Sequence, residues 1–140
     1  MLGYDFGEKP ADVRLTPVGW PINPEAFGET LRIVHARYAL PIYVLENGYG
    51  NSDQPDWAGA VIDTGRIEFL LAYIEAMNSA AAGGVDVRGY FIWSLIDNFE
   101  WDSGYSIRFG LTYVDYASLR RIPKSSFGWY AGLIKAAHRR

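Results

Sequence analysis

Helical spacing of apolar residues marks the first predictable element of the chain. Residues 23–25, Asn-Pro-Glu, are typical of a helix start, with a capping side chain, a proline at the first helical position and an acid in the first turn. Pro41 prevents a helix from continuing through that position. The apolar residues between these limits that recur at helical spacing are Phe27, Leu31, Val34 and Tyr38. The pattern predicts a helix from about residue 24 to residue 38.

Two predominantly apolar runs each end in a polar cluster. Residues 42–45 are followed by Glu46-Asn47-Gly48, and residues 87–96 are followed by Asp97-Asn98. Runs of this kind are typical of strands that are buried on both faces. We therefore predict two buried strands, each with acid-bearing residues at its carboxyl end.

The remaining segments complete an alternating order. Residues 1–22, 49–62 and 98–110 are rich in turn-forming or aromatic residues and are expected to be loops. A second helix is predicted after Thr64 as a cap, ending at Gly83-Gly84, and a last helix over residues 125–137. Residues 111–115 are expected to pair with the segment around Arg121. Helical crossovers between two strands make those strands parallel, and function in such sheets gathers at their carboxyl ends.

Composition narrows the class of protein. The net charge is −3, so no basic surface favours nucleic acid or an anionic membrane. There is no cysteine, and the two histidines, His35 and His138, are far apart, so no metal site is predicted. No signal peptide and no apolar run of ~20 residues is visible, so we expect a cytoplasmic protein without a membrane span. No cofactor motif is present.

Aromatic residues beside acids suggest a sugar site. Twelve of the 22 aromatic residues lie between positions 90 and 130. Glu46, at the rim of a strand, suits a nucleophile or a general acid or base; the alternative is a loop cap or an arginine partner. Glu100 and Trp101 suit hydroxyl binding and stacking on a sugar, whereas Trp93, within an apolar run, is locally predicted to be core.

Other polar residues have ordinary local explanations. Asp97-Asn98 is predicted to be a turn and cap cluster, and His35 to be structural. Arg66, Arg88 and Arg108 are expected to be solvated or ion-paired. The sequence does not decide whether Glu46 and Glu100 are the two catalytic carboxylates of a glycosidase. The distance between the two carboxylates determines the mechanism, and the sequence does not supply that distance.

Four segments together resemble the C-terminal part of glycoside hydrolase family 1, the β-glucosidase family. PIYVLENG (residues 41–48) resembles its nucleophile strand, and RGYFIWSLIDNFEWDSGYSIRFGLTYVDY (residues 88–116) resembles its last barrel strand and the sugar-binding loop after it. IPKSSFGWYAGLI (residues 122–134) resembles the final helix, and GWPINPEAF (residues 19–27) the approach to the sixth helix. The resemblance implies an α/β fold: residues 1–140 as one partial domain, the last two strands and flanking helices of a (β/α)8 TIM barrel.

The resemblance implies roles for six residues. Glu46 would be the nucleophile of a retaining β-glucosidase that needs no cofactor, and Trp93 would be the platform beneath the sugar. Glu100 would hold the 4- and 6-hydroxyls rather than act as the second catalytic carboxylate. Trp101 would donate its indole N–H to a hydroxyl. Two further residues would line the pocket, the second at the aglycone side: Phe109 and Trp20.

Departures from the family pattern shape the expected activity. Leu45 stands where the family usually has Thr, and Tyr73 where a His is common. The Asn-Glu-Pro motif that carries the acid/base glutamate is absent from the sequence. We therefore expect little activity from the chain alone, marginal stability, and a β-glucoside or oligosaccharide substrate once a complementary N-terminal fragment is supplied. The alternatives are a non-catalytic carbohydrate-binding module that uses Trp93, Trp101 and Glu100, and an inert product of a truncated gene.

Overall fold

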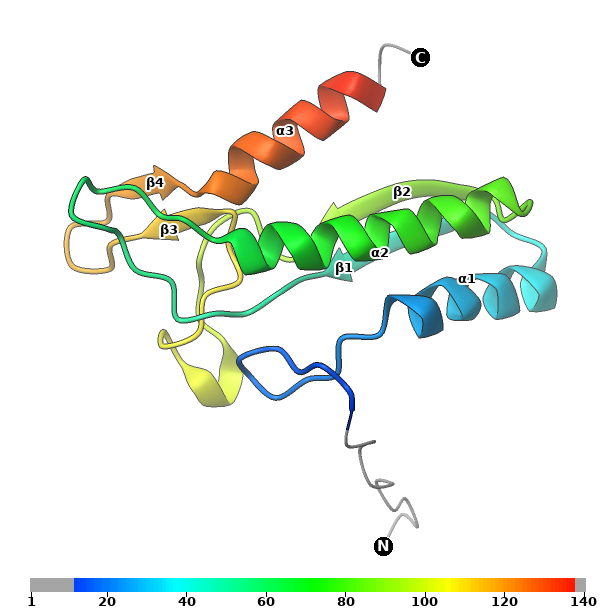
Figure 1. Cartoon of the computed structure of the whole chain (residues 1–140), viewed down its shortest axis with the longest axis horizontal. Coiled ribbons are helices and arrows are strands. Elements are labelled where there is room, and N and C mark those ends of the chain that lie inside the picture. Colours follow the sequence, from blue (N-terminus) through cyan, green and yellow to red (C-terminus); the bar gives the residue numbers. More distant parts are fainter. Residues whose placement is uncertain (1–11, 138–140) are drawn as a thin grey trace, which may run out of the picture.

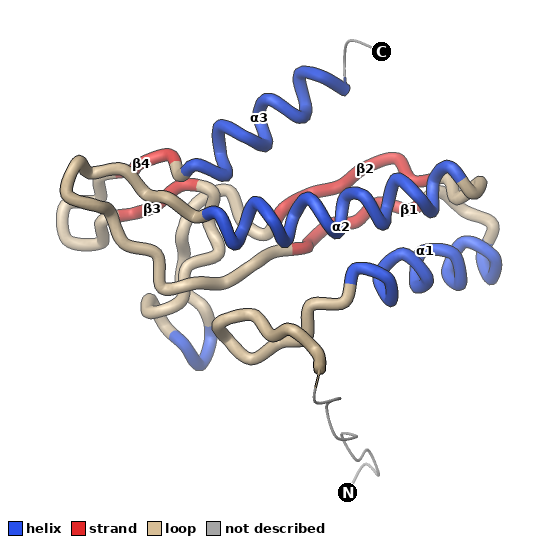
Figure 2. The backbone as a smooth tube through the Cα atoms, in the orientation of Figure 1, coloured by secondary structure: helices blue, strands red, loops and turns tan. Residues whose placement is uncertain are grey.

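Helices and strands alternate in the computed structural model, which describes residues 12–137 (Figures 1 and 2). His138 therefore lies outside the described residues. The elements, in chain order, are α1 (Pro24–Tyr38), β1 (Ile42–Asn47), α2 (Thr64–Ala82), β2 (Val87–Ile92), the 3-10 turn η1 (Trp101–Ser103), β3 (Thr112–Val114), β4 (Arg121–Pro123) and α3 (Ser125–Ala137).

β1 and β2 form a parallel pair joined through α2, as the order of elements predicted. Val44 lies opposite Tyr90, and the pairing becomes irregular between Val44 and Asn47, at the carboxyl end of β1. β3 and β4 pair antiparallel, which confirms the predicted hairpin. Both bounds of α3 agree with the prediction from sequence. The parallel pair therefore delivers its two strand ends to one edge, where the polar clusters lie.

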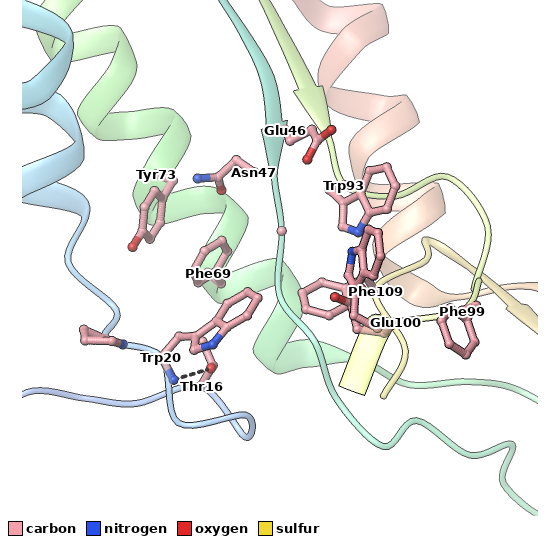
Figure 3. Close-up of a pocket in the computed structure, with 13 residues that line it drawn as sticks. Thr16, Trp20, Glu46, Asn47, Phe69, Tyr73, Trp93, Phe99, Glu100 and Phe109 are labelled. Carbon is pink, nitrogen blue, oxygen red and sulfur yellow. Dashed lines mark hydrogen bonds between the residues drawn. The ribbon is translucent and has the colours of Figure 1, made fainter. Parts of the chain in front are cut away.

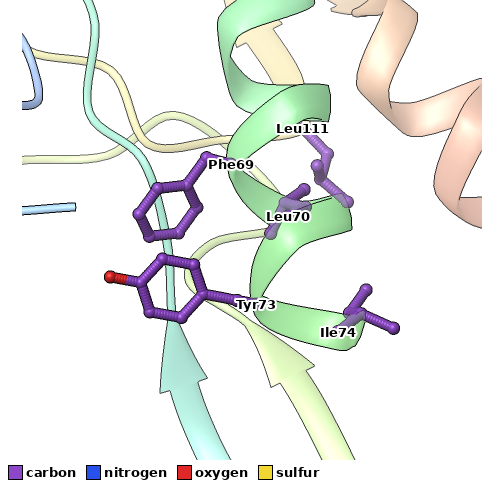
Figure 4. Close-up of a cluster of buried hydrophobic side chains, with 5 residues drawn as sticks. All are labelled: Phe69, Leu70, Tyr73, Ile74 and Leu111. Carbon is purple, nitrogen blue, oxygen red and sulfur yellow. The ribbon is translucent and has the colours of Figure 1, made fainter. Parts of the chain in front are cut away.

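The helices α1 and α2 cover one face of the parallel pair (Figure 1). Leu31 of α1, Val44 of β1 and Ala80 of α2 are buried together. A second cluster lies nearer the start of α2 and includes Leu111, from the segment that leads into β3 (Figure 4). Its buried members are Phe69, Leu70, Tyr73, Ile74 and Leu111. The apolar face of α2 thus joins the strand pair to the loop after β2.

The opposite face of the parallel pair is open, so the prediction that both strands are buried on both faces is wrong for this chain. Tyr43, Leu45 and Phe91 are 54%, 70% and 54% exposed. Two strands and the helices of one side supply apolar partners for one sheet face only. A continuous apolar run is typical of a strand that is buried on both faces. The described residues cover only one of those two faces.

Several element boundaries also differ from the predictions, and β1 extends to Asn47 instead of ending at Leu45. β2 ends at Ile92 instead of Ile96, because the chain then turns toward the segment before β3: the Ser94 N–H donates to the Phe109 carbonyl at 3.1 Å. Thr64 is the first helical residue of α2, and Asp63 occupies the cap position. Within residues 12–137, no helix is long and apolar enough to cross a membrane.

Candidate active site

A cleft of about 670 Å3 opens at the carboxyl ends of β1 and β2. This volume is within the usual range for a small-molecule site. The cleft is lined by all six residues that the sequence singled out (Figure 3): Trp20, Glu46, Trp93, Glu100, Trp101 and Phe109. Residues that are up to 89 positions apart in the sequence thus share one concave surface.

The Glu46 carboxylate has no partner among the side chains of residues 12–137. It is the penultimate residue of β1, and its side chain points toward Trp93, whereas Asn47 points to the other side (Figure 3). The Asn47 side chain accepts a hydrogen bond from the Tyr90 hydroxyl at 3.0 Å. No hydrogen bond or ion pair forms between the Glu46 carboxylate and any side chain of residues 12–137, so the cap or arginine partner considered as an alternative is not observed.

The ends of the two strands approach each other closely beside Glu46. The Trp93 N–H donates to the Asn47 carbonyl at 2.9 Å. Gly48 permits this approach, because a Cβ at that position would collide with the carbonyl oxygen of Trp93. Trp93 is 38% exposed and lines the cleft, so the local prediction that it is core is wrong. The apolar run in the sequence continues past Ile92, where β2 ends, and for this reason the pattern suggested that Trp93 is buried.

Glu100 and Trp101 lie on a tight turn of the loop after β2. The Glu100 N–H donates to the Gly104 carbonyl, and the Gly104 N–H donates back to Glu100, both at 2.7 Å. This pairing brackets η1 and fixes the backbone at Glu100, whose carboxylate forms no hydrogen bond or ion pair with another side chain of residues 12–137. Trp101 is 84% exposed. The turn therefore offers an acid and an indole to whatever enters the cleft.

Trp20 and Phe109 form a third wall. Their ring centroids are 5.7 Å apart. The backbone N–H of Trp20 donates to the Thr16 hydroxyl at 3.1 Å, which closes a small turn before α1 (Figure 3). Phe109 is buried, whereas Trp20 is half exposed. An aromatic pair thus holds the segment before α1 against the loop after β2.

Comparison with known proteins shows the same likeness over nearly the whole chain. The model of glycosyl hydrolase family 1 matches residues 6–139. This chain belongs to glycosyl hydrolase family 1. A bifunctional beta-D-glucosidase/beta-D-fucosidase of Bifidobacterium breve is 48% identical over 124 residues, which are 85% of this chain and 27% of that protein.

Solved structures of family 1 enzymes agree with the fold. A psychrophilic beta-glucosidase from Micrococcus antarcticus matches with a TM-score of 0.88 at 45% identity, covering 91% of this chain and 28% of the other. The family 1 beta-glucosidase from Thermotoga maritima, solved with isofagomine lactam, gives a TM-score of 0.88 at 42% identity, covering 94% and 30%. The fold is therefore part of a (β/α)8 barrel, and the chain spans less than a third of the length of these relatives.

The two departures from the family 1 pattern have different surroundings. Tyr73 is a packing residue: its ring stacks on Phe69 with centroids 4.2 Å apart, and its hydroxyl accepts from the Asn23 N–H at 3.0 Å. Leu45 is 70% exposed on the open face of the sheet, next to Glu46 in the chain. The first change is absorbed by the core, whereas the second places an apolar side chain where the described residues provide no cover.

A buried charge network lies behind the cleft, and the sequence reasoning missed it. The Lys124 ammonium lies 2.6 Å from an Asp53 oxygen and 2.8 Å from an Asp97 oxygen, and all three side chains are at most 1% exposed. Asp97 is thus an ion-paired core residue, and the prediction of a turn cap holds only for Asn98, whose amide donates to the Ser94 hydroxyl at 2.9 Å. Lys124, which precedes α3, thereby joins the start of that helix to the loop after β1 and to the loop after β2.

Two buried arginines complete the network. Arg108 donates to Asp97 at 2.8 Å, and its guanidinium lies 4.0 Å from the centre of the Tyr113 ring. Arg66 donates to Asp53 at 2.7 Å and also pairs with Asp63. The expectation of an ion-paired role is confirmed for both arginines. Because three carboxylates face three cations, the network carries no net charge.

Burial and pairing act in opposite directions on the ionisation of this network. Burial alone would raise the pKa of the Asp53 carboxyl, but the charges of Arg66 and Lys124 outweigh it and hold that pKa below its ordinary value. Burial and the nearby Arg66 lower the pKa of the Lys124 ammonium, while the two aspartates oppose that shift. Arg66 and Asp63 are three positions apart, but the partners in the other pairs are 11 to 71 positions apart, so no local sequence signal could have found those pairs.

Proposed function

We propose that this chain supplies the nucleophile and most of the aromatic sugar platform of a retaining β-glucosidase. The observation that supports it best is that the Glu46 carboxylate, which has no partner among the described residues, shares one cleft with Trp93, Glu100 and Trp101. Membership of family 1 and the names of the relatives support the same reaction class. The substrate is a β-glucoside or a related β-glycoside.

The proposed reaction is a double displacement at the anomeric carbon. Glu46 attacks that carbon while the leaving-group oxygen takes a proton from a carboxylic acid, and a covalent glycosyl-enzyme results. Water then attacks the same carbon and gives its proton to the carboxylate that acted as acid, while the bond between that carbon and Glu46 breaks; Glu46 is released as a carboxylate and the sugar leaves with its configuration retained. This course needs a second carboxyl group about 5–5.5 Å from the nucleophile.

Glu100 is assigned to binding rather than to proton transfer. Its fixed turn and free carboxylate suit two hydroxyl groups of the sugar, which donate to the carboxylate oxygens. Trp93 would stack on the apolar face of the sugar and Trp101 would donate its indole N–H. A 6-phosphate would be repelled by the Glu100 carboxylate, so the proposed sugar is neutral.

The acid/base residue would come from outside the matched part of the barrel. This chain spans less than a third of its relatives and lacks the Asn-Glu-Pro motif, so we propose that turnover requires a complementary N-terminal segment. Loss of a general acid typically costs about 10²–10⁴ in rate. We therefore expect the isolated chain to bind sugar but to hydrolyse it very slowly.

A complementation assay tests this proposal. The chain is mixed with the part of the Thermotoga maritima β-glucosidase that it does not match, and hydrolysis of an aryl β-glucoside is followed. We expect turnover with the wild type, loss of at least ~10³-fold in Glu46→Gln, and no loss in Glu75→Gln, an exposed glutamate on α2. Turnover that survives in Glu46→Gln would refute the role of Glu46.

A carbohydrate-binding module is the second candidate, favoured by the exposure of Trp93 and Trp101 beside the free Glu100 carboxylate. Titration with glucose or cellobiose, followed by tryptophan fluorescence, separates the two. Saturable binding by the chain, together with no turnover in a mixture that does form a complex, would favour the module over the hydrolase.

A further inference from the structure

The turn that carries Glu100 and Trp101 has little support of its own. Glu100 and Gly104 form an isolated antiparallel bridge, and η1 lies between them. None of the three residues of η1 is buried, and the Trp101 side chain is 84% exposed. A two-stranded hairpin by itself is at best marginally stable in water. The position of the Glu100 carboxylate therefore depends on contacts outside the turn.

An aromatic pair closes the base of this turn. Phe99 directly precedes Glu100 in the chain. Tyr105 directly follows Gly104, so it lies opposite Phe99 across the bridge. The centroids of the two rings are 5.6 Å apart, and the rings meet edge to face. Because aromatic pairs across two strands stabilise antiparallel pairing, this pair joins the segments that enter and leave the turn.

Tyr116 connects the aromatic pair to the buried charge network. The centroids of the Tyr116 and Tyr105 rings are 4.5 Å apart, and the Tyr116 hydroxyl donates to the Asn98 carbonyl at 3.3 Å. The guanidinium of Arg108, which pairs with a buried aspartate of the network, lies 4.6 Å from the centre of the Tyr116 ring. A continuous set of contacts thus runs from Phe99, which lines the cleft, to a buried cation behind it.

We propose that Tyr105 and Tyr116 are positioning residues that set the preference of the cleft for particular sugar hydroxyls. In the described part of the chain, neither side chain is among those that line the cleft, so both act through Glu100. By fixing the turn, they keep the Glu100 carboxylate where sugar hydroxyls can donate to it. The inference rests on the binding role proposed for Glu100 and names the residues on which that role depends.

Hydrogen exchange of the full 140-residue chain tests the positioning without any sugar. Tyr105→Ala removes a ring that is 56% exposed, Tyr105→Phe keeps the ring, and the matched control Tyr38→Ala removes a 59% exposed ring on α1. Exchange of the amides of Glu100 and Gly104 is compared with exchange of α2 in the same sample. We expect it to be at least about tenfold faster in Tyr105→Ala, and unchanged in the other two variants. Equally fast exchange in the wild type and in Tyr105→Ala would overturn the inference.

Discrimination between two sugars tests whether the effect passes through Glu100. The chain is titrated with methyl β-glucoside and with its 6-deoxy analogue, which lacks a hydroxyl proposed to donate to the carboxylate, and tryptophan fluorescence is followed. The wild type should prefer the glucoside by about tenfold, as expected for one hydrogen bond to a charged group. Tyr105→Ala should lower this ratio to that of Glu100→Gln, whereas Tyr105→Phe and Tyr38→Ala should keep it. A general weakening of the fold would lower both affinities and leave their ratio unchanged.

The two proposals fail in different ways. A wild type that binds both sugars equally, or binds neither, would refute the role of Glu100 in the proposed function, and this inference would fall with it. A wild type that discriminates by about tenfold, beside a Tyr105→Ala chain that discriminates equally well, would overturn this inference and leave the role of Glu100 intact.

Discussion

Lys124→Met is the substitution that tests the buried network most directly. Methionine preserves much of the length and apolar volume of the lysine stem and removes its charge. The ammonium lies 2.6 Å from Asp53 and 2.8 Å from Asp97, and the lysine side chain has no solvent exposure. The variant therefore leaves three buried carboxylates facing two arginines, so that the neutral network becomes a buried net negative charge.

The structure indicates the size of the effect. Removal of one partner from a buried ion pair typically costs about 3–5 kcal/mol, because a charge is left without compensation. Asp53 and Asp97 each keep an arginine, at 2.7 and 2.8 Å, and methionine avoids the desolvation that lowers the pKa of Lys124. We therefore expect the low end of that range, about 3 kcal/mol. This is a large fraction of the ~5–15 kcal/mol that stabilises a typical domain.

Equilibrium urea unfolding of the chain, bound to the complementary part of a relative, measures this loss by tryptophan fluorescence. With a slope of about 2 kcal/mol per molar urea, the midpoint should fall by about 1.5 M. The control is Arg88→Met, which removes an exposed ion pair with Asp86 at 2.9 Å and should leave the midpoint nearly unchanged, because water and salt screen exposed charges. If the two variants lose equal stability, the reasoning about the network is wrong.

Three further predictions concern the cleft and the fold. Gly48→Ala should lower stability by about 1–3 kcal/mol in a urea titration, because its methyl group meets the Trp93 carbonyl; unchanged stability and sugar affinity would contradict this. The melting temperature should fall as the pH rises above about 10, because burial raises the pKa of Tyr90, Tyr116 and Tyr130, so the folded state holds those protons more tightly than the unfolded state; a rising melting temperature there would disprove the sign. The isolated chain should melt with poor cooperativity or associate, because one sheet face and two strand edges lack partners within residues 12–137; a sharp two-state melt of a monomer, by calorimetry and sedimentation, would refute it.

Local sequence signals predicted the elements well. The Asn-Pro-Glu start and Pro41 bounded α1, and the residues after Pro123 predicted α3, because caps and prolines act on their own neighbours in the chain. The order of helices and strands also predicted that β1 and β2 are parallel. The six cleft residues were found because each lies in a segment that resembles family 1, at a strand end or in a predicted loop.

The tertiary structure decided what depends on partners far along the chain. Asp97 resembled a turn cap, yet Lys124 and Arg108, 27 and 11 positions away, make it the centre of a buried ion-paired network. Trp93 resembled a core residue, yet it faces the cleft, because the ladder ends one residue earlier. The sequence alone determined which segments form helices and strands, through short-range sterics and capping. Which side chains meet, and which sheet face stays open, was decided by the folded arrangement, since charge pairing and burial depend on groups that only folding brings together.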